Sequence, residues 1–429
     1  MLQGRCFSFV AMLFVTSALA FPAHAETLQE KLGRIVKDHD LMKVVEAEAE
    51  SLQHQVSVEE SRWYPTVSVG ATPGWQAYRR DDGDSTKWHT EELSVQVEQT
   101  VWDFGATDQS IRKADAALHK KNVEIELQEQ NLLLAGIEAH LRLRKAWEVL
   151  RYARNSEQNI RRQARMESAR VDAGSGYSTD VLQAKATLSQ AEARRIVAEG
   201  EVEKAVARYK AVFMDGDVDP AKLDAVRMPA ALLPANLEDL LARVEKQNPD
   251  LRRAREVVAV ADITKDLVEA REWAPTVKLV GEHAYDRNVD GLRDGKWDSS
   301  VKLKVAWSFD TGLKAASAVH AAAADASAER AKAFYVGRQA VEESVNAWNA
   351  MRVAREQSRM LQEQMDLQKQ FLEFARKERE LGRRSLLDVL NGETQLLNAE
   401  GDYAAAQIDL ILSAYRVIRA YGGVRLDDI

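Results

Sequence analysis

The sequence predicts a mainly α-helical protein with a small β part, built as a tandem repeat of one unit. Proline is absent from 74–219 and from 276–429. Because proline in a helix interior costs ~3 kcal/mol, these two stretches permit very long helices. Short motifs of the first half recur roughly 210 residues later, as the Trp-x-Pro motif ending at Pro65 does at Pro275. We therefore assign repeat 1 to 26–213, a linker to 214–236 and repeat 2 to 237–429.

The first 25 residues have the pattern of a secretory signal peptide. Arg5 precedes an apolar run over 7–21, and a small-x-small site follows, which predicts cleavage after Ala25. The apolar run is shorter than the ~20 residues that a transmembrane helix needs. Cys6, the only cysteine, lies in this segment. The mature chain would therefore have no disulfide, no thiolate metal site and no cysteine nucleophile.

Composition excludes further classes. The net charge of −8 argues against nucleic acid as a partner. No segment after the signal peptide approaches 18 uninterrupted apolar residues, so no membrane-spanning helix is expected. An exported soluble protein and an outer-membrane barrel both remain compatible with these facts, because the hydropathy signal of barrel strands is weak.

Each repeat is predicted to contain a helix, two strands, a long helix, a turn and a last helix. The first helical regions are 27–62 and 237–273. After Pro65 and Pro275 the apolar period changes to two residues, which gives a strand one apolar and one polar face. The predicted strands are 66–78, 91–103, 276–286 and 298–309.

Two interpretations of these strands are open. Their length of roughly 10–12 residues is that of tilted membrane strands. They could instead form soluble hairpins packed on the helices, although a lone two-stranded hairpin is marginal in water. Four strands cannot close a barrel, so membrane strands would need partner subunits to cover their edges.

The predicted long helices cover about 106–171 and 313–381, each ~100 Å long at 1.5 Å per residue. Such lengths, with heptad-like apolar spacing, favour a coiled coil or helical tube. The helices end in glycine-containing turns at 172–179 and 382–385, where glycine suits a left-handed cap. Ser178, Thr179 or Asp180 in the first turn, and Ser385 in the second, are expected to supply N-cap oxygens.

This pattern resembles the TolC family, whose chains duplicate such a unit. The resemblance covers the mature chain and depends on the strand-starting Pro65 and Pro275 and on three motifs. The motifs are EQTVWDFG (98–105), GSGYSTDVL (174–182) and GRRSLLDVL (382–390).

The resemblance implies a passive export conduit without cofactor or catalytic residues. It would be a homotrimer whose strands form one twelve-stranded barrel among outer-membrane lipids. Its helices would form a periplasmic α-barrel that meets a periplasmic adaptor and an inner-membrane pump.

Site residues follow from the same resemblance. Two aperture positions depart from the family pattern: a second ring aspartate is Asn391 here, and a tyrosine is Arg379, which could pair with Asp180. The implied aperture residues are Asp180, Arg379, Arg384, Asp388 and Asn391, and the implied adaptor-docking residues are Gly174, Ser175, Gly176, Gly382, Arg383 and Ser385.

Several alternatives remain open. The cargo is expected to be protein, as in type I secretion, with small-molecule or multidrug efflux as the alternative. A periplasmic coiled-coil adaptor or scaffold is a hypothesis from another class. Asp103-Phe104-Gly105 matches a kinase triplet but fits a strand-to-helix turn better, and no metal site is expected. The acidic segment 286–294 resembles part of a calcium loop but has Trp297 at the twelfth position.

Overall fold

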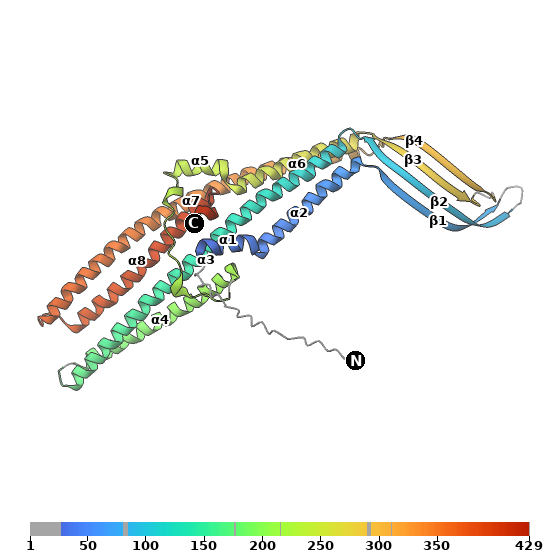
Figure 1. Ribbon diagram of the computed structural model, residues 1–429. Coiled ribbons are helices and arrows are strands. Elements are labelled where there is room, and N and C mark those ends of the chain that lie inside the picture. The colour runs from blue at the N-terminus through green and yellow to red at the C-terminus, as the bar shows by residue number, and fades with distance from the viewer. Residues whose placement is uncertain are drawn as a thin grey trace, which may run out of the picture.

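The computed structural model describes residues 27–79, 85–175, 177–214, 216–289, 293–309 and 311–428. The molecule is long and bent, with a four-stranded sheet at one end and two helical hairpins at the other (Figure 1). Each repeat contributes one hairpin of strands and one hairpin of helices. The predicted signal peptide, 1–25, and Gly176 of the first turn lie outside the described residues.

Each repeat begins with a pair of helices rather than the single helical region predicted. In repeat 1 these are α1 (Leu28–Asp38) and α2 (Asp40–Glu60), and in repeat 2 α5 (Leu237–Gln247) and α6 (Pro249–Trp273). The breaks occur where a side chain caps the second helix. His39 Nδ1 accepts a hydrogen bond from the Leu41 amide at 3.1 Å, and Asn248 Oδ1 from the Leu251 amide at 2.9 Å.

The strands form one antiparallel sheet in the order β1-β2-β3-β4. They are β1 (Thr66–Arg79), β2 (Ser85–Trp102), β3 (Thr276–Arg287) and β4 (Gly295–Ala306). The predicted starts after Pro65 and Pro275 are confirmed. The second strand of each hairpin begins earlier than predicted, because pairing continues to Arg79↔Ser85 and Arg287↔Gly295.

The two long helices are confirmed. They are α3 (Ala106–Asp172) and α7 (Lys314–Glu380), each of 67 residues and so ~100 Å long. The chain returns along them in α4 (Ser178–Phe213) and α8 (Leu386–Ala420), and α3 also packs against α8. Helices of the described part include none with the long uncharged apolar stretch that crossing a membrane requires.

The main hydrophobic core lies midway along the helices, where α1 and the end of α8 pack against α3 and where α5 packs against α7 (Figure 1). Short 3₁₀ turns at Pro220–Lys222 and Ala230–Leu232 lie in the linker, and others are at Ser61–Trp63 and Leu426–Asp428. Gly136 of α3 permits this packing, because a Cβ there would lie 2.4 Å from Leu32 Cδ2 of α1. The core fully buries side chains of several elements, namely α1, α3, α4, α5 and α8, among them Leu32, Ile35, Leu133, Ile137, Phe213, Leu240 and Ile418.

Candidate functional site

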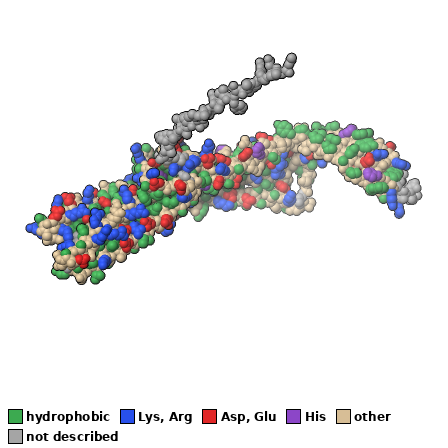
Figure 2. Space-filling view, turned by 60° about the horizontal axis from the view of Figure 1, so that its bottom comes forward, with side chains coloured by type: hydrophobic (Ala, Val, Ile, Leu, Met, Phe, Trp, Pro, Cys, Tyr) green, Lys and Arg blue, Asp and Glu red, His purple; other side chains and the backbone are tan. Residues whose placement is uncertain are grey.

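One face of the sheet is apolar and exposed. The register sets Val67 opposite Val97, and Leu279 opposite Leu303, on this face. Val69 and Val301 are each 78% exposed. Figure 2 shows hydrophobic side chains gathered over the sheet, whereas Lys and Arg side chains gather over the helical hairpins. An exposed apolar surface of this extent indicates contact with lipid or another protein. We call it the outward face.

The opposite face of the sheet carries polar and charged side chains. Lys278 Nζ lies 2.6 Å from Glu98 Oε1 on the neighbouring strand. Lys302 Nζ lies 3.7 Å from Glu282 Oε2, and Lys296 Nζ lies 3.2 Å from Asp298 Oδ2. The alternation predicted from the sequence therefore separates two chemically distinct surfaces. The exposed apolar face contradicts the interpretation of hairpins packed on the helices.

Aromatic side chains lie at both ends of the outward face. At the loop end, Tyr285 and Trp297 have ring centroids 4.7 Å apart, and at the helix end Trp307 and Phe309 lie 4.5 Å apart. Trp297 and Trp307 are separated by roughly ten residues, or ~33 Å along the strand. At the tilt of 35–45° usual in membrane barrels, this corresponds to an apolar band ~25 Å tall, the height of a membrane barrel's band.

The outer strands leave two edges open. Among the described residues, β1 pairs only with β2, and β4 only with β3. Open, long strand edges pair readily with other chains. A four-stranded sheet with these edges can therefore extend from one copy of the chain to the next.

At the far end of the helices, both turns have the same backbone geometry. Gly174 and Gly382 have φ of 79° and 73°. In the first turn, the Gly174 amide donates to Val171 O at 2.9 Å and the Ser175 amide to Arg170 O at 2.9 Å. This is a Schellman cap, as predicted from the glycines.

The second turn repeats the same cap. The Gly382 amide donates to Arg379 O at 2.8 Å, and the Arg383 amide donates to Glu378 O at 2.9 Å. The two hairpin tips lie at the same end of the molecule, opposite the sheet (Figure 1). The turns that the sequence singled out are therefore neighbours at one end of the protein.

Of the two N-caps expected at the turns, the one at α8 is confirmed and the one at α4 is not. Ser385 caps α8, because its Oγ accepts a hydrogen bond from the Asp388 amide at 3.1 Å. The expectation for Ser178, Thr179 or Asp180 is wrong. Helix α4 begins at Ser178 with Tyr177 in the N-cap position, and no side chain bonds to its first turn. Ser178 is thus already inside the helix, where its hydroxyl cannot take the N-cap role.

The implied aperture residues occupy different surroundings. Arg384 Nε donates to Glu378 Oε2 at 2.7 Å, and its guanidinium lies 5.2 Å from the Phe371 ring centroid. Asp388 and Asn391 are exposed on α8, whereas Asp180 is half-buried on α4. Asp388 is therefore accessible to ions in solution.

Arg379 interacts with another helix than expected. It lies close enough to Arg170 and Glu167 of α3 to feel both charges. Burial, together with the Arg170 cation, lowers the pKa of the Arg379 guanidinium. The contacts of the described residues include no bond from Arg379 to Asp180. Arg379 therefore lies beside α3 near the tip of the α3/α4 hairpin, close to Glu167.

Sequence reasoning missed a polar link between the two helical hairpins. Gln163 of α3 donates to Glu393 of α8, and the other Glu393 oxygen accepts from Arg376 of α7 at 2.7 Å. Gln163 is buried and the Glu393 side chain is only 13% exposed. A hydrogen bond between the buried Gln163 and the largely buried Glu393 favours one relative position of the two hairpins that carry them.

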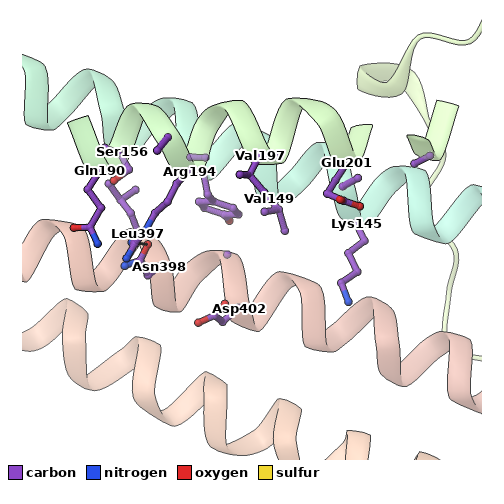
Figure 3. A pocket seen from close by; sticks show the side chains of 18 of the residues that line it. Lys145, Val149, Ser156, Gln190, Arg194, Val197, Glu201, Leu397, Asn398 and Asp402 are labelled. Carbon is purple, nitrogen blue, oxygen red and sulfur yellow. Dashed lines mark hydrogen bonds between the residues drawn. The ribbon is translucent and has the colours of Figure 1, made fainter. Parts of the chain in front are cut away.

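A groove of about 1040 Å³ lies between α4 and α8, with α3 as its floor. Figure 3 shows Val149 and Val197 on one side of it and Asn398 and Asp402 on the other. Arg194 Nη1 of α4 donates to Asn398 Oδ1 of α8 at 3.1 Å across the groove. Because the walls come from both repeats, the width of this groove depends on how the two hairpins are placed.

One of the two remaining sequence motifs has a structural explanation. Asp103 closes a strand-to-helix turn, because its carboxylate accepts from the Gly105 amide at 3.2 Å and the Thr107 amide at 2.8 Å. In the described ranges, no three His, Cys, Asp or Glu residues cluster as metal ligands would. Part of the acidic segment 286–294, whose sequence resembles part of a calcium loop, lies outside those ranges.

The sequence matches the family described as outer membrane efflux protein over 34–212 and 240–423. Outer membrane efflux protein BepC of Brucella suis is 23% identical, with 95% of this chain and 88% of BepC covered. Outer membrane protein TolC of Vibrio cholerae is 22% identical, with 97% of this chain and 96% of that protein covered. The solved structure of the outer-membrane channel OprN has a TM-score of 0.78 at 21% identity, covering 92% of this chain and 90% of that chain.

Proposed function

Because the chain belongs to the outer membrane efflux protein family, we propose that three copies of it form one passive export channel. The channel crosses the outer membrane and extends into the periplasm. The family is one of outer-membrane channels and not of enzymes, which agrees with the expectation of a protein without catalytic residues.

The outward face of the sheet is the observation that carries this proposal. Its apolar band matches a bilayer in height, and its strands have the opposite, polar face that a water-filled lumen needs. Three sheets joined edge to edge, β4 of one copy to β1 of the next, give twelve strands. Closure removes the open edges, which is how barrels avoid unwanted pairing.

The helices give the channel its second part. With the sheet in the outer membrane, α3 and α7 extend ~100 Å away from it. The capped turns at Gly174 and Gly382 then lie at the periplasmic end, together with Ser175, Arg383 and Ser385. We place the contact with a periplasmic adaptor, and through it an inner-membrane pump, at these turns.

Asp388 is proposed to form the narrowest charged ring. In a trimer with α8 lining the inner end, three Asp388 carboxylates would converge on the axis, repel each other and attract cations. Asn391, one turn further, adds no charge to this ring. Arg384, held by Glu378 and Phe371, would shape the turn that carries Asp388.

For the cargo, the similarity to BepC, an outer membrane efflux protein, favours efflux. Protein secretion of the type I class is the alternative that the sequence resemblance favoured. Deleting the gene distinguishes the two kinds of cargo when both sensitivity to toxic small molecules and the proteins released into the medium are measured. Sensitivity to toxic small molecules supports efflux, whereas loss of proteins from the culture medium supports secretion.

The scaffold hypothesis conflicts with the exposed apolar sheet, which a soluble periplasmic protein would have to cover. Membrane fractionation decides this point, because a scaffold stays in the soluble periplasmic fraction. Recovery of the protein with outer membranes supports the channel.

Planar-bilayer conductance tests the channel directly, with the oligomer mass fixed by light scattering. We expect a trimer that gives small, cation-selective steps. Asp388→Ala should enlarge the steps and reduce selectivity, whereas Asp217→Ala should leave both unchanged. Asp217 is the matched control because it is a fully exposed linker acid remote from the tips. A monomer or dimer without conductance would overturn the proposal.

A further inference from the structure

Charged side chains on the outward face of the sheet are confined to its loop end. The odd-numbered residues of the four strands share this face, as Val67, Val97 and Val305 show. Among the odd-numbered residues in the described parts of the strands, those nearer the helices are apolar, uncharged polar or aromatic. The charged residues are Arg79, Lys87, Glu91 and Arg287, all beyond or beside the loop-end aromatic residues.

The three cations of this group lie just beyond the loop-end aromatic residues. Arg287 follows Tyr285 on β3 by about two residue steps, or ~7 Å along the strand. Lys87 is equally far beyond His89, whose ring contacts Trp75. Arg79, Lys87 and Arg287 are all exposed. Aromatic residues occupy the interface of a membrane barrel, so cations just beyond them reach the level of the headgroups.

The placement of these cations differs from that of other lysines in the sheet. On the opposite face, Lys278, Lys296 and Lys302 each have a carboxylate within 4 Å. On the outward face, Glu91 offers one carboxylate to the three cations, and its Oε2 lies 3.5 Å from Arg287 Nη1. An exposed pair at this distance contributes little and is easily exchanged for another anion. Counted over the described residues, the outward face therefore has a net positive charge at its loop end.

Resting on the proposed function, we infer that Arg79, Lys87 and Arg287 bind the phosphate groups of lipid headgroups in the outer leaflet. The guanidinium fork matches phosphate in a bidentate geometry, and lysine adds a point charge. Each basic residue near an anionic lipid surface contributes to binding, so three together discriminate a lipid with an anionic phosphate from a zwitterionic lipid, whose phosphate is balanced by a cation of its own headgroup. The trimer carries this group three times around its barrel.

The test measures the affinity of the purified trimer, in mixed micelles, for fluorescent phosphatidic acid against the matching phosphatidylcholine. The triple variant Arg79→Gln/Lys87→Gln/Arg287→Gln should bind phosphatidic acid about tenfold more weakly, which corresponds to ~1.4 kcal/mol. The control variant Lys296→Gln/Lys302→Gln/Lys304→Gln removes three cations from the opposite face of the same sheet. It should keep the affinity within about twofold.

Two competition measurements identify the ligand. Inorganic phosphate at millimolar concentration should not displace the labelled lipid, because the acyl chains supply part of the binding. Oleate, an anionic lipid without phosphate, should compete more weakly than phosphatidic acid. Displacement by inorganic phosphate alone, equal binding of the two labelled lipids, or an equal loss in the control variant would each overturn the inference.

Failure of this inference is distinguishable from failure of the proposed channel. Conductance of the triple variant in pure phosphatidylcholine bilayers should equal that of the unmodified protein. If lipid preference is missing while conductance is intact, only the inference fails. If the unmodified protein neither inserts nor conducts, the channel and the lipid site fail together.

Discussion

Replacing Gly136 with alanine is expected to weaken the docking of α1 on α3. A Cβ at Gly136 would lie 2.4 Å from Leu32 Cδ2 and 3.2 Å from Ile35 Cδ1. Both of these α1 side chains are fully buried, at 0% exposure. Either α1 moves away or Leu32 leaves its rotamer, and overpacking of this kind costs ~1–3 kcal/mol. Alanine also gains ~1 kcal/mol over glycine in a helix interior, which offsets part of that cost.

Gly337→Ala is the matched control. Gly337 occupies the interior of the equally long α7, and a Cβ there would lie 3.9 Å from its nearest neighbour, Leu251 Cδ2. The control therefore gains helix stability without a clash. Because the helix gain is common to both variants, their difference in the free energy of unfolding isolates the packing cost of ~1–3 kcal/mol.

Hydrogen exchange of α1 amides is the most direct assay, with thermal unfolding of the protein as the global measure. A local loss of ~1.4 kcal/mol speeds exchange tenfold when α1 opens independently. Equal exchange and equal melting in the two variants would refute the reasoning. Adding Leu32→Ala to Gly136→Ala removes the clashing atoms, so the combined loss should be smaller than the sum of the separate losses.

Three further predictions concern side chains with defined partners. Ser385→Ala should cost ~1 kcal/mol and increase hydrogen exchange at the start of α8, whereas Ser178→Ala should have little effect because Ser178 caps nothing. Burial lowers the pKa of His140, whose Nε2 bonds Asp224 O at 2.9 Å while its Nδ1 is buried without a hydrogen-bond partner among the described atoms. The unfolded imidazole therefore takes up its proton first, and the free energy of unfolding should fall as the pH drops below ~6.5. His140→Gln should reduce the difference in melting temperature between pH 7.5 and pH 5. Glu393→Ala should leave Gln163 and Arg376 without their shared carboxylate and increase exchange at both hairpin tips, and an unchanged exchange pattern would contradict the role of this link.

Local signals made most of the fold predictable. Pro65 and Pro275 mark strand starts because proline suits the position before a strand and cannot donate within the sheet. The long helices followed from the absence of such breakers. Strand ends were less well predicted, since β2 is extended by pairing with Arg79, a tertiary fact that residue type does not encode. The cap at Tyr177 was missed because three candidate cap residues follow it directly.

The tip turns were predictable for the same reason, since glycine at Gly174 and Gly382 is needed for positive φ. The link from Gln163 to Glu393 was not. The two residues are far apart in sequence, and each resembles an ordinary polar residue on a solvated helix surface. Whether a polar side chain faces solvent or a second hairpin depends on long-range packing, which one sequence does not reveal.

The pairing of Lys278 with Glu98 and of Lys302 with Glu282 on the polar face has an electrical consequence for transport. Each lysine and its carboxylate form a short dipole, and the potential of a dipole falls off faster with distance than that of a single charge. A lumen lined in this way would carry solutes of either sign with little preference. Such a pore acts as a neutral conductor, and discrimination among solutes then has to arise at the other end of the molecule, tens of ångströms away along the helices.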